Sequence, residues 1–245
     1  MIERQNMCPA LAKFGIDKLD DMLGGGLDRD TVNLVVGRNG VGKTILASQW
    51  AAEGVREGEN VAYILTTMSE NSCKSYLGNF SFMKDCYDKI DWIFLDIDVR
   101  DLLPLTKENF NRVFSSLFRG KLDDVDRLVF DSVTSVEKAF ADPVLYRRAL
   151  KFFSDLCYDS DVTALIVEEA PLYGEFGEAK ALSECVIHLD ILRVPNGYAR
   201  AMRLIKKYRT GHPLDWIPYE ITDDGIVLKE GRYVRVSYEF HYESG

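Results

Sequence analysis

A glycine-rich segment that ends in lysine and threonine carries the strongest chemical signal in this chain of 245 residues. Residues 37–44 read G-R-N-G-V-G-K-T and match the pattern G-x-x-x-x-G-K-[ST]. Glycines let backbone N–H groups converge on phosphate oxygens, and a helix that begins at Thr44 directs its positive end at the same anion. We expect Lys43 to reach the β- and γ-phosphates of a nucleotide and the Thr44 hydroxyl to bind Mg²⁺. The residues expected to bind the cofactor through this loop are Gly37, Arg38, Asn39, Gly40, Val41, Gly42, Lys43, Thr44 and Ile45.

A second acidic element lies further along the chain. Residues 127–132 read R-L-V-F-D-S, an apolar strand that ends in Asp131, as in a Walker B element. A carboxylate in that place can hold the hydration shell of Mg²⁺. Many buried strands end in aspartate at a turn, so the predicted metal role of Asp131 depends on the glycine-rich loop that precedes it.

The elements that must position these residues read as strands alternating with helices. Runs that are apolar at nearly every residue suit a sheet covered on both faces, and they occupy 31–36, Val61–Leu65, 92–97, Arg127–Asp131 and 162–167. Helical patterns occupy 44–56 and 107–119, and Asp142-Pro143 opens another helix in the favoured order of cap residue and N1 proline. This alternation predicts an α/β fold whose central sheet is mainly parallel, with helices on both faces.

The last quarter of the chain has a different pattern. Successive strands are expected at 186–192, 199–208, 217–221, 226–228 and 233–240. Turn residues at 195–197 and 223–225 predict hairpins, so these strands extend the sheet in antiparallel fashion at its C-terminal end. We expect one domain over residues 1–232 and an accessory strand and tail over 233–245.

Composition argues against several classes of protein. Apolar residues make up 47% and charged residues 28%, near the globular average. The net charge of −9 disfavours binding to nucleic acid or to an anionic membrane. No apolar run approaches the ~18 residues of a membrane span, and the polar start lacks the apolar core of a signal peptide. Five scattered cysteines without a C-x-x-C pair argue against a zinc site or a disulfide framework, and they fit a cytoplasmic location.

Several passages together carry a family resemblance. Residues 14–27 contain F-G-I-D-K-L-D and L-G-G-G-L, and residues 129–134 read V-F-D-S-V-T. Residues 162–169 form the next core strand, 207–212 read K-Y-R-T-G-H, and 218–226 form a closing strand and turn. With the glycine-rich loop at its expected distance, residues 10–230 resemble a single KaiC-like ATPase domain of the RecA superfamily.

The resemblance implies a RecA-like P-loop NTPase fold, ATP and Mg²⁺ as cofactors, and a homo-oligomer, often a hexameric ring. Nucleotide lies between subunits in such rings, and a K-x-R pair reaches the neighbour's γ-phosphate. Lys207 and Arg209 are therefore the candidate residues supplied in trans. The alternative is an ordinary solvated basic face, since Arg203 and Lys206 lie nearby in the sequence.

One departure from the family pattern affects hydrolysis. The family usually carries a Glu-Glu pair after the second core strand, whereas this chain has Thr67 and Met68 there. Methionine cannot accept a proton. Glu70 is the nearest carboxylate, and it is either the catalytic base after a small loop shift or a capping or surface residue before the helix at Asn71. Thr67 could hydrogen-bond the γ-phosphate. The segment is loosely similar to the accessory ATPase of the archaeal motility motor, which is thought to bind ATP more than it turns it over.

These features predict a slow ATPase that acts through nucleotide-dependent assembly in a regulatory or signalling role, with an unidentified protein partner. One alternative is a non-hydrolysing, nucleotide-gated scaffold. Another is a recombinase-like DNA-binding ATPase, which residues 171–184 disfavour. That segment carries Glu175, Glu178 and Glu184 against Lys180 alone, and a groove for single-stranded DNA needs the opposite sign.

Overall fold

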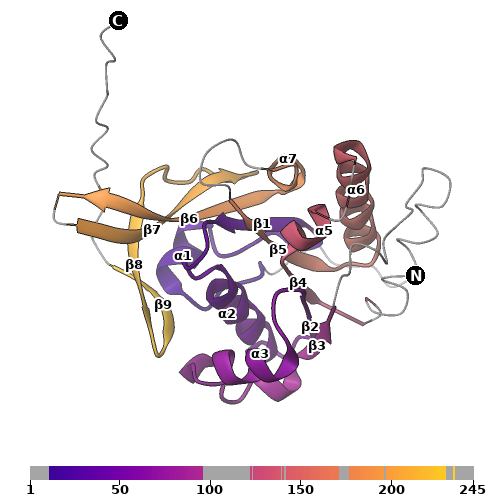
Figure 1. The fold of residues 1–245 in the computed structure, drawn as a ribbon, viewed down its shortest axis with the longest axis horizontal. Helices are drawn as coiled ribbons and strands as arrows, with labels where there is room; N and C mark the ends of the chain where they lie inside the picture. Colours follow the sequence, from indigo (N-terminus) through magenta and orange to yellow (C-terminus); the bar gives the residue numbers. More distant parts are fainter. Residues whose placement is uncertain are drawn as a thin grey trace, which may run out of the picture.

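A nine-stranded sheet organises the described part of the chain (Figure 1). The computed structural model describes residues 11–95, 122, 124–138, 140, 142–170, 177–195, 197–229 and 234. The strands lie in the order β3-β2-β4-β5-β1-β6-β7-β8-β9. Their bounds are β1 Val32–Gly37, β2 Val61–Leu65, β3 Asp91–Phe94, β4 Arg127–Asp131, β5 Thr163–Glu169, β6 Cys185–Val194, β7 Gly197–Lys207, β8 Ile217–Thr222 and β9 Gly225–Leu228.

The type of strand pairing changes once along this sheet. Pairing is parallel from β3 through β6 and antiparallel from β6 through β9. Because β5 lies between β1 and β4, the loop after β1 and the aspartate that ends β4 meet at the carboxyl edge of the parallel strands. In parallel α/β sheets this edge is where ligands bind.

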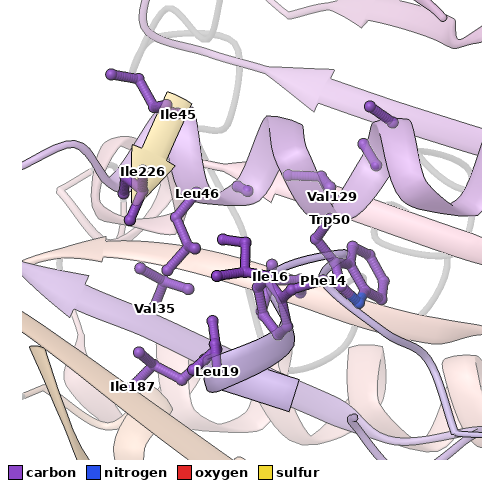
Figure 2. Close-up of a cluster of buried hydrophobic side chains, with 14 of the residues drawn as sticks. Phe14, Ile16, Leu19, Val35, Ile45, Leu46, Trp50, Val129, Ile187 and Ile226 are labelled. Carbon is purple, nitrogen blue, oxygen red and sulfur yellow. The ribbon is translucent and has the colours of Figure 1, made fainter. Parts of the chain in front are cut away.

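Helices cover both faces of the sheet. One face packs against α1 (Asp17–Met22), α2 (Lys43–Arg56), α3 (Glu70–Leu77) and the 3₁₀ turns η1 (Ser81–Met83) and η2 (Tyr87–Lys89), and the other packs against α5 (Val133–Glu137), α6 (Pro143–Asp159) and α7 (Ala179–Leu182). Figure 2 shows Leu46 and Trp50 of α2 in the first of these cores, near Phe14 and Val35. Among the described helices, none is long and apolar enough to cross a bilayer.

The predicted fold class is confirmed. The Asp142 side chain accepts a hydrogen bond from the backbone N–H of Val144 at 2.9 Å and caps α6, and Pro143 occupies the first turn. The strand predicted at 92–97 begins at Asp91 and ends at Phe94; Leu95 is outside it and residues 96–97 lie outside the described part. The helix predicted at 107–119 also lies outside the described residues, as does the strand predicted at 233–240 except for Val234, whose N–H donates to the carbonyl of Trp216 at 2.9 Å.

A buried arginine joins the start of β4 to the end of α2. The Arg127 side chain is fully buried at the start of β4 and forms ion pairs with Glu57 and Glu59, which follow α2. Its guanidinium also donates to the carbonyls of Lys13 and Trp50, at 2.7 and 3.0 Å, and lies 5.0 Å from the centre of the Trp50 ring. The strand that ends in Asp131 is therefore anchored at its other end to the helix that follows the glycine-rich loop.

Candidate functional site

The glycine-rich loop joins β1 to α2 and is shaped by its last glycine. Gly42 has φ of +100°, and a Cβ at this position would lie 2.9 Å from Cδ1 of Ile221, so both backbone and space require glycine. Gly42 is the N-cap of α2 and offers no side-chain cap, which leaves the first-turn N–H groups available to an anion. The Tyr219 hydroxyl donates to the Val41 carbonyl at 2.5 Å and holds the loop from β8. Ile45 points into the core, so only its backbone can serve a ligand.

The charges of two carboxylates act on Lys43. Its ammonium donates to the Arg38 carbonyl at 3.0 Å. Burial lowers the pKa of Lys43, while the charges of Asp131 and Glu169 act in the opposite direction. Glu169 ends β5 opposite Gly37, and it accepts a hydrogen bond of 2.6 Å from the Asn39 side chain. The sheet thus brings Glu169 to the loop, a contact that sequence spacing did not reveal.

Thr44 and Asp131 meet directly. The Thr44 hydroxyl donates to Oδ2 of Asp131 at 2.7 Å, and the hydroxyl of Tyr63, from β2, lies 3.3 Å from the same oxygen. Burial raises the pKa of Asp131, and the bonds from Thr44 and Tyr63 and the charge of Lys43 oppose that rise. Hydroxyl and carboxylate oxygens are ligands that Mg²⁺ prefers, and a cation would relieve the buried negative charge. The residues present therefore fit a nucleotide-bound Mg²⁺.

Tyr63 is a site residue that the sequence analysis missed. It lies in the middle of β2, and its side chain is fully buried. The available signal was a lone hydroxyl within an otherwise apolar strand, because a buried tyrosine hydroxyl usually finds a hydrogen-bond partner.

The segment after β2 reaches the same edge of the sheet. The Thr66 N–H donates to the Asp131 carbonyl at 2.8 Å, and the Ser132 N–H donates to the Thr66 hydroxyl at 3.0 Å. A pocket of about 470 Å³ adjoins this junction and is lined by Thr66, Thr67, Met68, Ser69, Glu70, Phe94 and Leu95. Glu70 is the exposed first residue of α3, and Ser69 caps that helix. The structure thus brings Thr67 and Glu70 to the edge that holds Asp131.

The predicted trans residues lie at the opposite edge. In the sheet, Lys207 of β7 lies opposite Cys185 of β6. Leu189, also in β6, lies beside Gly37 of β1. The step of four residues from Cys185 to Leu189 corresponds to roughly 13 Å along β6. Lys207 is only 6% exposed and its ammonium lies 2.5 Å from Asp28, whereas Arg209 is exposed on a turn with φ of +63°.

Arg38 is held within its own chain. Its Nε donates to Asp190 at 2.7 Å, and its terminal nitrogen donates to the carbonyl of Ile191 at 2.6 Å. These contacts direct the guanidinium along β6, and they leave the backbone of Arg38, whose carbonyl binds Lys43, as its part of the loop.

A buried carboxyl group borders the site. Glu168 is 2% exposed, and its Oε1 accepts a hydrogen bond from the Gly177 N–H at 2.9 Å. Among the described residues, its Oε2 has no hydrogen-bond partner. Burial raises the pKa of Glu168 to about 7, and the charge of Glu137 adds to the rise. Glu168 therefore takes up a proton more readily in the folded chain than in the unfolded one.

We expect Glu168 to make stability depend on pH. Its contribution is fully present below the unfolded pKa of 4.5 and is lost as pH rises toward about 7. The loss amounts to about 3 kcal/mol. Replacing Glu168 by Gln should therefore raise the melting temperature relative to wild type at pH 8 but not at pH 4.5. Thermal unfolding at several pH values, with the partly exposed Glu178→Gln as the matched control, measures this difference. Parallel curves for wild type and Glu168→Gln would contradict it.

Comparisons with known proteins give a consistent result. Residues 12–233 match the family model for KaiC ATPases. An Aeropyrum pernix protein named UPF0273 is 25% identical over 91% of this chain and 95% of its own length. The circadian clock protein KaiC3 of Synechocystis is 22% identical over 93% of this chain and 47% of its own length. The crystal structure of a KaiC-like protein from Pyrococcus horikoshii superposes with a TM-score of 0.72 at 25% identity, over 89% of this chain and 97% of that one.

Proposed function

This chain belongs to the KaiC family of ATPases, and on that premise we propose that it binds ATP with Mg²⁺ and uses the nucleotide to control its assembly with copies of itself. The observation that carries the proposal is the 2.7 Å bond between Thr44 and Asp131 beside Lys43. It joins the phosphate loop and the acidic strand end in one site. The Synechocystis relative is a circadian clock protein, which supports a regulatory role.

The chain's own groups divide the work of holding the nucleotide. The first-turn N–H groups of α2 and the Lys43 ammonium would bind the phosphates, and Thr44 and Asp131 would hold Mg²⁺. When bound, Mg²⁺ neutralises charge on the phosphate oxygens. Tyr63 keeps the Asp131 carboxylate oriented, and the bond between Asn39 and Glu169 keeps the outer part of the loop against β5.

Hydrolysis is slow in this proposal because no carboxylate occupies the usual place of the base. Thr67 and Met68 lie there, and Met68 packs against the core. Glu70, the first residue of α3, is the base if the segment after β2 shifts toward the site. Thr67 contributes a hydrogen bond to phosphate. A non-hydrolysing scaffold is the alternative, favoured by the same Thr67-Met68 pair.

Arg209 supports the assembly part of the proposal. It lies at the amino edge of the parallel strands, too far from its own phosphate loop to serve it. A second copy that places its carboxyl edge against this surface would bring the two together, and repetition of that contact closes a ring, hexameric in this proposal. An arginine at such a junction suits phosphate because its planar fork can donate two bonds.

The proposal is tested by measuring particle mass and phosphate release of the full chain. We expect light scattering to show a larger particle, toward six copies, in Mg-ATP than in EDTA or Mg-ADP. The rate of phosphate release in Mg-ATP should be below about 1 s⁻¹, which is the low end for ordinary enzymes. Lys43→Ala should abolish both responses, and the exposed Lys84→Ala should change neither. Identical mass in EDTA and Mg-ATP would contradict the proposal, while assembly without phosphate release would favour the scaffold.

A further inference from the structure

The turn that carries Arg209 rests on a segment near the start of the chain. Lys207, at the end of β7, forms its ion pair with Asp28. At Thr210, the residue after Arg209, the chain also meets the glycine run at 24–26. Gly24 has φ of +71°, and a Cβ there would lie 3.0 Å from Cγ2 of Thr210. Residues 24–28 therefore form a seat for the turn at 207–211, and the seat is defined by these two contacts.

Further contacts fix the backbone on the other side of the turn. The Tyr208 N–H donates to the Glu184 carbonyl at 3.2 Å. The Lys206 ammonium lies 4.2 Å from the centre of the Tyr208 ring and donates to the Ala181 carbonyl at 3.3 Å. In the described part of the chain, no hydrogen bond or ion pair holds the guanidinium of Arg209. The turn is thus fixed on both sides while its arginine stays available to a ligand.

The ion pair between Lys207 and Asp28 is largely buried. The Lys207 side chain is 1% exposed, and the side chain of its partner Asp28 is 21% exposed. A buried ammonium needs a charge partner, so loss of Asp28 would leave Lys207 unpaired and force it toward water. Because Lys207 and Arg209 share one short turn, that movement would displace Arg209.

We propose that Asp28 is a positioning residue for Arg209. By pairing with Lys207 it holds the turn at 207–211 in the conformation that presents the guanidinium to the nucleotide of a neighbouring copy. Lys207 acts within its own chain, and Arg209 alone crosses to the neighbour. This inference rests on the proposed function, since it assigns a role to residues of the assembled site.

The first test uses paired substitutions. Asp28→Asn and Lys207→Met should each reduce Mg-ATP-dependent assembly and phosphate release about tenfold, near the loss caused by Arg209→Ala. The double variant Asp28→Asn/Lys207→Met should regain most of the response, because no unpaired charge remains. A double variant as defective as Lys207→Met alone would overturn the inference, because Lys207 would then be needed at the phosphate itself.

Mixing variants shows on which edge the defect lies. Lys43→Ala damages the phosphate loop, while Arg209→Ala and Asp28→Asn damage the opposite edge. Mixtures of Lys43→Ala with either of the other two should regain activity, because some interfaces then combine an intact loop with an intact arginine edge. A mixture of Arg209→Ala with Asp28→Asn should stay inactive. Activity in that mixture would overturn the inference. A variant with a general folding defect would not show this dependence on which edge its partner variant damages.

Hydrogen exchange without nucleotide measures directly how well residues 24–28 hold the turn at 207–211. Asp28→Asn should speed amide exchange in residues 207–211 and leave residues 37–44 unchanged. Unchanged exchange at 207–211 would overturn the inference. A wild-type chain that does not respond to Mg-ATP would contradict the proposed function, whereas a responsive wild type with an equally responsive Asp28→Asn variant would contradict this inference alone.

Discussion

Replacement of Asp131 by asparagine is expected to weaken ATP binding in the presence of Mg²⁺ by about 10- to 100-fold. The amide keeps the shape of the carboxylate and can still bond to Thr44 and Tyr63, but it removes the charge that attracts the cation. Without Mg²⁺ the affinity should stay close to that of wild type, because the loop N–H groups and Lys43 are untouched. Titration calorimetry in Mg²⁺ and in EDTA measures the two affinities.

The same substitution should not destabilise the ligand-free chain. Burial raises the pKa of Asp131, so its charged form is unfavourable in the folded state, and the neutral amide avoids that cost. Thermal unfolding in EDTA should give a melting temperature equal to or above that of wild type. Equal Mg-ATP affinity for wild type and Asp131→Asn would contradict a metal role, and a lower melting temperature in EDTA would attribute any loss of affinity to misfolding.

Replacement of Arg127 by leucine is expected to lower the free energy of unfolding by about 3–5 kcal/mol. The change leaves Glu57 and Glu59 without their buried partner and removes the donor that the carbonyls of Lys13 and Trp50 share. Urea unfolding followed by tryptophan fluorescence reports this directly, because the Arg127 guanidinium lies over the Trp50 ring.

A surface arginine gives the matched control. Arg147 pairs with Glu178 at 2.8 Å, but its side chain is 58% exposed. Arg147→Leu should therefore cost no more than about 1 kcal/mol. If Arg127→Leu cost as little as Arg147→Leu, the buried ion cluster would contribute nothing to the anchoring of β4, and the account of how Asp131 is held in place would be wrong.

Most of the fold follows from local patterns in the chain. Apolar runs marked β1, β2, β4 and β5, and Asp142-Pro143 marked the start of α6, because strand burial and helix capping act between near neighbours. The predicted bounds of β3 were less accurate. It is an edge strand with partly exposed side chains, so its apolar pattern extended past the residues that pair with β2.

The candidate site also has a part that local sequence predicted and a part that only the structure shows. The loop at 37–44 and Asp131 were predicted from spacing and residue type. The geometry adds Tyr63 and Glu169, which reach the site from β2 and β5. Lys207 was predicted as a residue facing a neighbour, and the structure places it inside the chain against Asp28. The identity of a charged residue does not show whether its side chain is exposed or paired within the chain. Here the partner, Asp28, is 179 positions away in the sequence.

The sequence by itself determined the phosphate loop, the acidic strand end and the α/β alternation, because glycine spacing, apolar periodicity and turn residues act over short stretches of chain. Only the tertiary structure decided which of these parts meet. The placement of β5 between β1 and β4 brings Thr44 to Asp131, and the pairing of β6 with β7 carries Arg209 to the far edge. Such contacts depend on strand order and on the packing of distant side chains, which local spacing does not encode.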